Sequence, residues 1–232
     1  MYVVVMLATL GMVQASETTA GLTTGYESQY IFRGQKISDN VGSAAVSVSL
    51  PTNTDLSIKS YWNNKSASPS VGNETDLNLN QRLALDSASD LVIGGTVYVY
   101  PGNDPRKSQT PYTTELYTGI NYKSFLNPSL RVGYNLTLKQ LYTEGVLSQD
   151  IPLVGALSLR PAAALGWVQT GDARPELVGK EVKNGYNYGY ASADLVYKIK
   201  QVELSAGARY NYLADSTTTK HAWFGAAATV RF

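Results

Sequence analysis

The final stretch of the sequence, residues 222–232, constrains the fold more than any other segment. Apolar or small residues fill its even positions, including Phe224, Val230 and Phe232, while its odd positions are mixed, with Trp223 followed by small or polar residues. This alternation predicts a β-strand with one apolar face. An apolar strand face that ends on an aromatic residue is typical of the last strand of an outer-membrane β-barrel, which pairs with the first strand and removes the edges of the sheet. We therefore expect Phe224, Val230 and Phe232 to lie on a barrel-closing strand. A soluble β-sandwich whose last strand has the same pattern is the alternative.

The other end of the sequence predicts export. Residues 3–12 form an apolar run, and Val13-Gln14-Ala15 follows it as a small-residue cleavage site. This arrangement is typical of a secretory signal peptide, and the run is too short to span a membrane as a helix. Because Met1-Tyr2 carries no Lys or Arg, we expect the signal peptide to be truncated at its start. The predicted organisation is a signal peptide over 1–15 and one barrel domain over 16–232; the alternative makes residues 3–12 a buried strand or helix.

Composition removes several classes of protein. The sequence has no Cys, which excludes disulfide scaffolds and cysteine zinc modules. Its net charge is +1 and its acidic and basic residues are interspersed, so no nucleic-acid partner is expected. No apolar run after the signal peptide approaches the length of a transmembrane helix, whereas a barrel strand needs only about 9–11 alternating residues. The 17 Tyr and 4 Phe also match the aromatic usage of barrel strands.

Alternating segments cover most of the sequence after Ser16, and none shows helical periodicity. We predict twelve strands, near 20–33, 42–50, 54–63, 75–86, 89–100, 112–123, 128–138, 141–151, 155–168, 185–198, 201–212 and 221–232.

The links between these segments alternate in length. Short, turn-like links are expected at 51–54, 86–89, 123–127, 152–154 and 199–200, and longer polar links at 34–41, 64–74, 101–111, 169–184 and 213–220. The alternation fails only at Lys139-Gln140. An outer-membrane barrel with both ends in the periplasm has short periplasmic turns, longer external loops and an even number of strands. A Greek-key sandwich gives no reason for this regularity. The predicted fold is therefore all-β, an antiparallel transmembrane β-barrel of twelve strands in the bacterial outer membrane.

Charged residues mark the lumen face, because hydrocarbon tolerates almost no charge. The predicted pore-lining residues are Glu27, Arg33, Lys59, Asp76, Arg82, Glu115, Arg131, Glu144, Arg160, Asp194, Glu203, Arg209 and Arg231. Their signs nearly balance. They therefore either line an open pore or pair across the lumen and plug it.

The segment Ser28 to Gly34, followed by Gln35 and Ser38, resembles the S-x-Y-x-F-R-G-x-x-x-S signature of the TorF-type porin family. This family is also called the Gcw_chp family of bacterial outer-membrane proteins of unknown function. The sequence departs from the family at Gln35-Lys36-Ile37, where apolar residues are commoner. The resemblance implies a porin-like barrel of undefined substrate and supplies no catalytic residues. Gly34 suits a turn and Arg33 the outer rim of the lumen. Alternatively, Phe32-Arg33-Gly34 only fixes barrel closure against the final strand.

Enzymatic signals are weak. The only histidine, His221, follows the polar loop residues 215–217, and neighbouring positions in one loop rarely supply the geometry of a catalytic triad. The sequence contains no phosphate-binding glycine loop and no His-Glu-x-x-His metal motif, so we expect neither a cofactor nor a metal. The acids Asp172, Glu176 and Glu181 are expected to be solvated, with a divalent ion or a bridge to lipopolysaccharide as the alternative.

These features together predict a passive channel for small hydrophilic solutes. Twelve strands should leave a narrow pore, because eight-stranded barrels are filled and sixteen-stranded ones are open. The expected partners are outer-membrane lipid, lipopolysaccharide, the solutes themselves, and the barrel-assembly machinery acting on the C-terminal strand. The alternative is a plugged structural or adhesive barrel that acts through loops 64–74 and 169–184. A more remote alternative is an enzyme that modifies membrane lipids.

Overall fold

A computed structural model describes residues 17–66, 73–101, 111–170, 185–212 and 220–232. The predicted signal peptide, loop residues 215–217 and the acids Asp172, Glu176 and Glu181 lie outside this part of the chain. The described residues include no helix that is long and apolar enough to cross a membrane.

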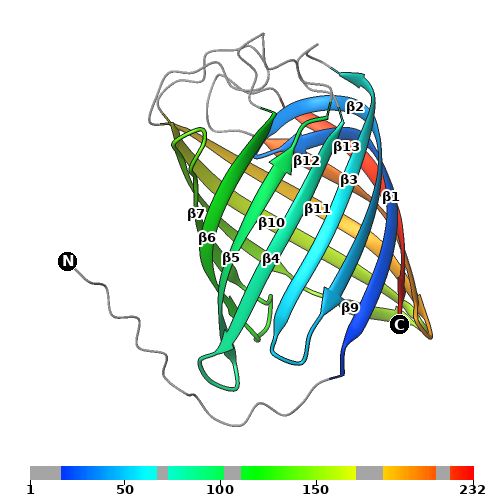
Figure 1. The fold of residues 1–232 in the computed structure, drawn as a ribbon. Helices are drawn as coiled ribbons and strands as arrows, with labels where there is room; N and C mark the ends of the chain where they lie inside the picture. The colour runs from blue at the N-terminus through cyan, green and yellow to red at the C-terminus, as the bar shows by residue number, and fades with distance from the viewer. Residues whose placement is uncertain (1–16, 67–72, 102–110, 171–184, 213–219) are drawn as a thin grey trace.

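The described residues form tilted strands around one closed barrel (Figure 1). The strands are β1 (Thr19–Phe32), β2 (Gln35–Ser49), β3 (Thr54–Ser66), β4 (Glu74–Ala84), β5 (Ser89–Val99), β6 (Tyr112–Tyr122), β7 (Ser129–Asn135), β8 (Gln140–Ser148), β9 (Ile151–Val154), β10 (Leu157–Thr170), β11 (Tyr186–Ile199), β12 (Val202–Tyr212) and β13 (His221–Arg231).

Every strand of the barrel wall pairs antiparallel with its neighbours. The order runs β11-β12-β13-β1 and on through β8 to β10, and β10 pairs with β11 to complete the ring. Among the described residues, the short strand β9 pairs only with β10, and it continues the line of β8 after a break at Gln149-Asp150. The wall therefore has twelve strands in the described part of the chain, which confirms the predicted all-β antiparallel barrel.

The ring closes where the last strand meets the first. β13 pairs with β1 from Gly21↔Arg231 to Glu27↔Gly225. The backbone N–H of Phe232 donates to the carbonyl of Ala20 at 2.8 Å. This pairing leaves neither β1 nor β13 with an open edge over that length, which is how barrels avoid edge-to-edge association.

Large apolar side chains cover the outside of the barrel. Leu56, Ile58 and Trp62 alternate on β3 with inward residues, and Ile58 is 54% exposed. The same alternation exposes further residues around the ring, including Leu79, Leu116, Leu130, Trp167, Leu195, Leu204, Phe224 and Phe232. A continuous exposed apolar band of this kind is unfavourable in water and favourable in hydrocarbon.

We call the end at which β1 begins and β13 ends the base, and the opposite end the mouth (Figure 1). The predicted strands match the observed ones within a few residues, with two exceptions in the links. The predicted turn at 152–154 is wrong, because these residues belong to β9 and the turn falls at Gly155, where φ is +56°. The predicted long link over 34–41 is also wrong, because β2 begins at Gln35 directly after a two-residue turn.

Candidate functional site

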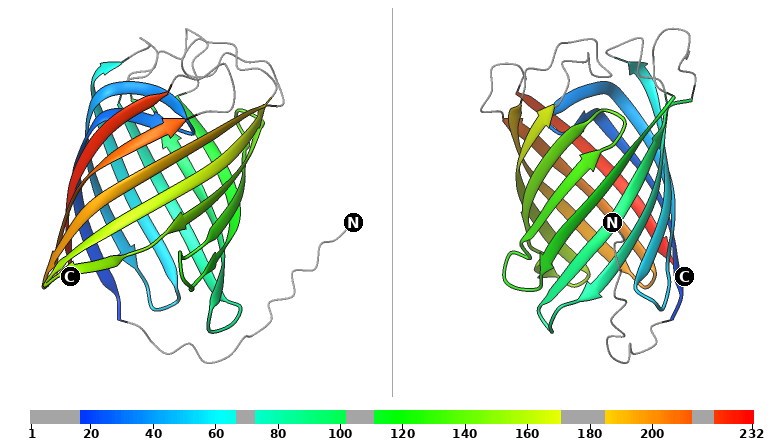
Figure 2. Two further views of the ribbon diagram at one scale, coloured as in Figure 1. Left: turned by 180° about the vertical axis from the view of Figure 1, so that it is seen from behind. Right: turned by 60° about the vertical axis from the view of Figure 1, so that its left-hand side comes forward.

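The tip of the β1–β2 hairpin leaves the barrel wall at the mouth. Pairing of β1 with β13 stops at Glu27, whereas pairing of β1 with β2 continues to Phe32↔Gln35. The register shifts between Tyr30 and Ile31 at the start of the tip. A shift of this kind bends a strand and increases its twist. β2 accordingly curves across the mouth in the views of Figures 1 and 2. We call residues 29–38 the hairpin tip.

The turn of this hairpin has a left-handed backbone at both central residues. Arg33 has φ +47° and Gly34 has φ +77°. A two-residue turn of this geometry matches the natural twist of paired strands, and glycine adopts it freely. Arginine in the left-handed region costs about 1–2 kcal/mol. The contacts of the Arg33 side chain must therefore compensate for this cost.

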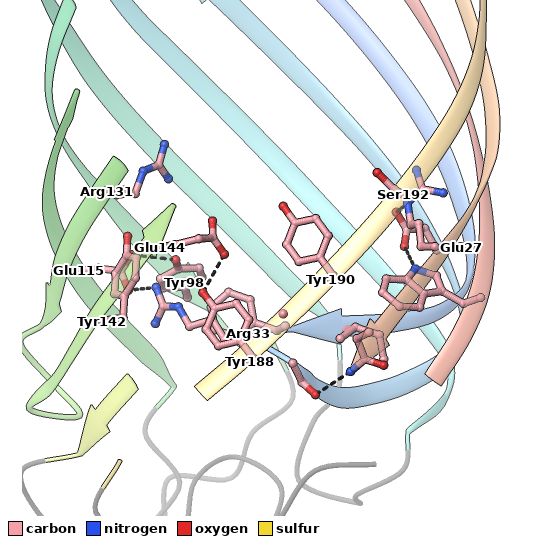
Figure 3. Close-up of a pocket in the computed structure, with 17 residues that line it drawn as sticks. Glu27, Arg33, Tyr98, Glu115, Arg131, Tyr142, Glu144, Tyr188, Tyr190 and Ser192 are labelled. Carbon is pink, nitrogen blue, oxygen red and sulfur yellow. Dashed lines mark hydrogen bonds and ion pairs between the residues drawn. The ribbon is translucent and has the colours of Figure 1, made fainter. Parts of the chain in front are cut away.

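Those contacts reach across the lumen to β6 and β8 (Figure 3). Nη2 of Arg33 lies 2.6 Å from Oε2 of Glu115, and the side chains are 8% and 2% exposed. Nη1 donates to Gln140 at 3.4 Å, and Cζ lies 3.6 Å from the centre of the Tyr142 ring. Burial alone would lower the pKa of Arg33, but Glu115 raises it above its ordinary value, so the guanidinium stays charged.

Three further contacts fix the hairpin tip. Nδ2 of Asn211 on β12 donates to the carbonyl of Gly34 at 3.1 Å. The hydroxyl of Tyr30 donates to Glu74 on β4 at 2.8 Å, and its ring stacks on Tyr61 with centroids 4.9 Å apart. Side chains from five wall strands, β3, β4, β6, β8 and β12, thus hold the tip. The tip lies inside the mouth of the barrel, and Arg33, which the sequence placed at the outer rim of the lumen, is buried there.

A polar cavity of about 370 Å³ adjoins the hairpin tip inside the barrel (Figure 3). This volume is several times the space of one water molecule, which is about 30 Å³ in the liquid. Six charged and six aromatic residues help to line it: Glu27, Arg33, Glu115, Arg131, Glu144, Arg209, Phe32, Tyr98, Tyr142, Tyr188, Tyr190 and Trp223. The cavity therefore combines charges of both signs with aromatic surfaces.

The charged residues of the cavity are all among those predicted from the sequence. Asp194 does not line the cavity but pairs with Arg209, which does, at 3.2 Å. Lys59 and Asp76 are register partners on β3 and β4, outside the cavity lining, and Lys59 lies 4.5 Å from the Tyr61 ring.

The remaining predicted residues lie near the base. Arg160 contacts both Asp150 at 2.5 Å and Glu203 at 3.3 Å, and Arg231 also contacts Glu203 at 3.3 Å. Hydrogen bonds from Arg160 hold the pKa of Asp150 below its ordinary value. Arg82 pairs with Asp55 at 3.0 Å. These ion pairs join neighbouring or next-nearest strands, so they follow the wall instead of crossing the lumen.

The tyrosines of the cavity and Asn211 are not among the residues predicted from the sequence. Tyr142 lies on the same strand face as Glu144, two residues away, and Tyr188 lies on the same strand face as Asp194, six residues away. Because side chains two residues apart share a face, strand parity alone could have placed these tyrosines inside. No local signal marks Asn211 as a partner of Gly34, which lies 177 residues away in the chain.

Tyr142 packs directly over Gly133 on β7, and a Cβ at Gly133 would collide with its ring. Gly133→Val should therefore displace Tyr142 and lower the free energy of unfolding by about 1–3 kcal/mol, as overpacking does elsewhere. Denaturant unfolding in detergent micelles would measure this loss. Gly145→Val is the matched control, since the nearest atom to a Cβ there is the carbonyl oxygen of Ser129 at 3.9 Å. Equal unfolding midpoints for the two variants would contradict the prediction.

No protein-family model and no curated protein matches this sequence. Its fold nevertheless matches solved structures. The KdgM porin is 12% identical, with a TM-score of 0.58 over 91% of this chain and 99% of that one. A NanC porin structure is 9% identical, with a TM-score of 0.58 over 91% and 98%. The COG4313 outer membrane channel from Pseudomonas putida F1 is 10% identical, with a TM-score of 0.56 over 97% and 100%. At such identities the likeness establishes the fold, and this chain has the fold of an outer-membrane channel barrel.

Proposed function

We propose that this protein is an outer-membrane channel through which small hydrophilic solutes diffuse passively. The observation that carries the proposal is the charged cavity of about 370 Å³ inside a closed barrel whose outside is apolar. A barrel of this kind is stable in a bilayer and offers polar solutes a path that avoids hydrocarbon. The likeness in fold to the KdgM and NanC porins supports the same conclusion.

In this proposal the hairpin tip narrows the path at the external mouth. Solutes pass the tip and enter the cavity, where arginines and carboxylates on different strands create a field across the lumen. The path through the cavity is narrowed by four tyrosines that line it, Tyr98, Tyr142, Tyr188 and Tyr190. Lipid and lipopolysaccharide would surround the apolar band, and the barrel-assembly machinery would recognise β13. Membership of the TorF-type porin family is part of the proposal and rests on Ser28 to Ser38.

The other two hypotheses gain no specific support. The loops invoked for adhesion lie largely outside the described residues. His221 is the only histidine, and the described residues contain no group of three or more metal-ligating side chains. That the protein is not an enzyme remains a prediction.

Single-channel recording in planar bilayers tests the proposed channel. Refolded protein should produce discrete conducting steps in potassium chloride, because water and ions fill the charged cavity. Salts of larger cations and anions should then show, through the reversal potential, which lumen charges dominate. Silence at every voltage from protein that is demonstrably folded and inserted would refute the channel and favour a plugged barrel.

A further inference from the structure

Two opposite charges in the cavity stand side by side without pairing. Arg131 on β7 and Glu144 on β8 are direct partners in the strand register, and both line the cavity. Opposite charges at such positions usually attract each other across the two strands. Within the described part of the chain, neither side chain forms an ion pair with the other or with a third residue.

Aromatic residues hold these two charges apart. The guanidinium carbon of Arg131 lies 4.5 Å from the centre of the Tyr117 ring, on β6. Oε2 of Glu144 accepts a hydrogen bond from the hydroxyl of Tyr188, on β11, at 2.7 Å (Figure 3). β6 adjoins β7 on one side of the pair, whereas β11 lies beyond β10 on the other side. The contacts therefore draw the two charges in opposite directions along the wall.

The other charges that line the cavity have partners. Arg33 pairs with Glu115 at 2.6 Å, and Arg209 pairs with Asp194 at 3.2 Å. Glu27 lies 3.9 Å from Arg209 in an ion pair and also accepts a hydrogen bond from the indole of Trp223 at 2.9 Å. The charged groups of the cavity that have no ion-pair partner among the described residues are thus the guanidinium of Arg131 and the carboxylate of Glu144.

We propose that Arg131 and Glu144 form a two-point binding site for a small zwitterionic solute of the amino-acid type. Its carboxylate would accept hydrogen bonds from the Arg131 guanidinium, and its ammonium would donate to Glu144. Charge-assisted hydrogen bonds of this kind are about twice as strong as neutral ones. A simple anion or cation satisfies only one of the two groups, and a neutral solute satisfies neither. This inference rests on the proposed channel and adds its substrate class.

Block of the potassium chloride current by four probes of similar size tests the site. The probes are glycine, glycolate, ethanolamine and glycolamide, which are zwitterionic, anionic, cationic and neutral near pH 7. Glycine should half-saturate the block at a concentration about tenfold below those of the other three, which is the factor for one additional favourable contact. Equal half-saturating concentrations for the four probes would overturn the site.

Variants assign the effect to the two charges. Arg131→Gln and Glu144→Gln should each abolish the preference for glycine. The double variant that exchanges the charges, Arg131→Glu with Glu144→Arg, should restore the preference, with glycine bound in the opposite orientation. The matched control is Lys123→Gln, which removes a base-end cation that pairs with Asp90 at 2.9 Å. This control should keep the preference. A preference that survives Arg131→Gln would refute the proposal.

Equilibrium binding separates the site from the channel. Saturation-transfer NMR on detergent-solubilised protein should detect glycine on the wild type and lose the signal in Arg131→Gln and Glu144→Gln. Binding without any conductance would refute the channel and retain the site. Conductance without glycine binding would retain the channel and refute the site.

Discussion

Arg33→Ala is expected to raise the single-channel conductance, because the variant releases the hairpin tip from the opposite wall. The Arg33 side chain is 8% exposed and that of Glu115 is 2% exposed, so the variant leaves a buried carboxylate without its cation. Breaking a buried pair by removing one partner costs about 3–5 kcal/mol. This cost applies only while the tip lies inward and covers Glu115. The equilibrium between inward and outward positions of the tip therefore shifts toward outward positions, which leave the mouth open.

The second partner provides an internal check on this expectation. Glu115→Gln keeps a hydrogen-bond acceptor for Arg33 and avoids an unpaired buried carboxylate, so its conductance should rise less than that of Arg33→Ala. Lys123→Ala removes an ion pair at the base, far from the tip, and should leave the conductance unchanged. An Arg33→Ala channel with the wild-type conductance would show that the tip does not limit the current.

The barrel wall could be predicted from the sequence because its physical cause is local. A strand with one face in hydrocarbon and one in water must alternate along its own length, as Leu130 and Val132 do around Arg131. The same parity identified the inward charges. It could not identify their partners, because those depend on the shear and closure of the whole ring. Glu115 lies 82 residues from Arg33 in the chain.

The hairpin tip escaped prediction for a different reason. The largely polar segment 35–40 follows a glycine and precedes an alternating stretch, and the same pattern is typical of a loop. In the structure it is polar because it lies within the lumen, where Ser38 is fully buried and the tip contacts charged wall residues. Similarly, Pro152 suggested a turn, but it lies in β9. Among the described residues β9 pairs only with β10, so its other edge is unpaired. A proline there removes no hydrogen bond on the unpaired edge.

Ile58→Arg is expected to destabilise the membrane-inserted barrel by about 2–4 kcal/mol, the range measured for arginine on the lipid face of a barrel near the bilayer midplane. Ile58 is 54% exposed on the outside of β3, between the outward residues Leu56 and Trp62. A guanidinium there must enter hydrocarbon or distort the bilayer to reach water, whereas the native side chain is already in its preferred solvent.

The neighbouring residue on the same strand makes this expectation specific to the lipid face. Ser57 points to the opposite side of β3, where it faces Asn78 in the register with β4. Ser57→Arg adds the same charge at the same depth but places it in the aqueous lumen, so it should leave stability within about 1 kcal/mol of the wild type and reduce the conductance to cations. Urea titrations of refolding into lipid vesicles would measure both variants. Equal losses of stability in the two would mean that the outward face of β3 does not contact hydrocarbon, because only a hydrocarbon environment separates the two positions by several kcal/mol.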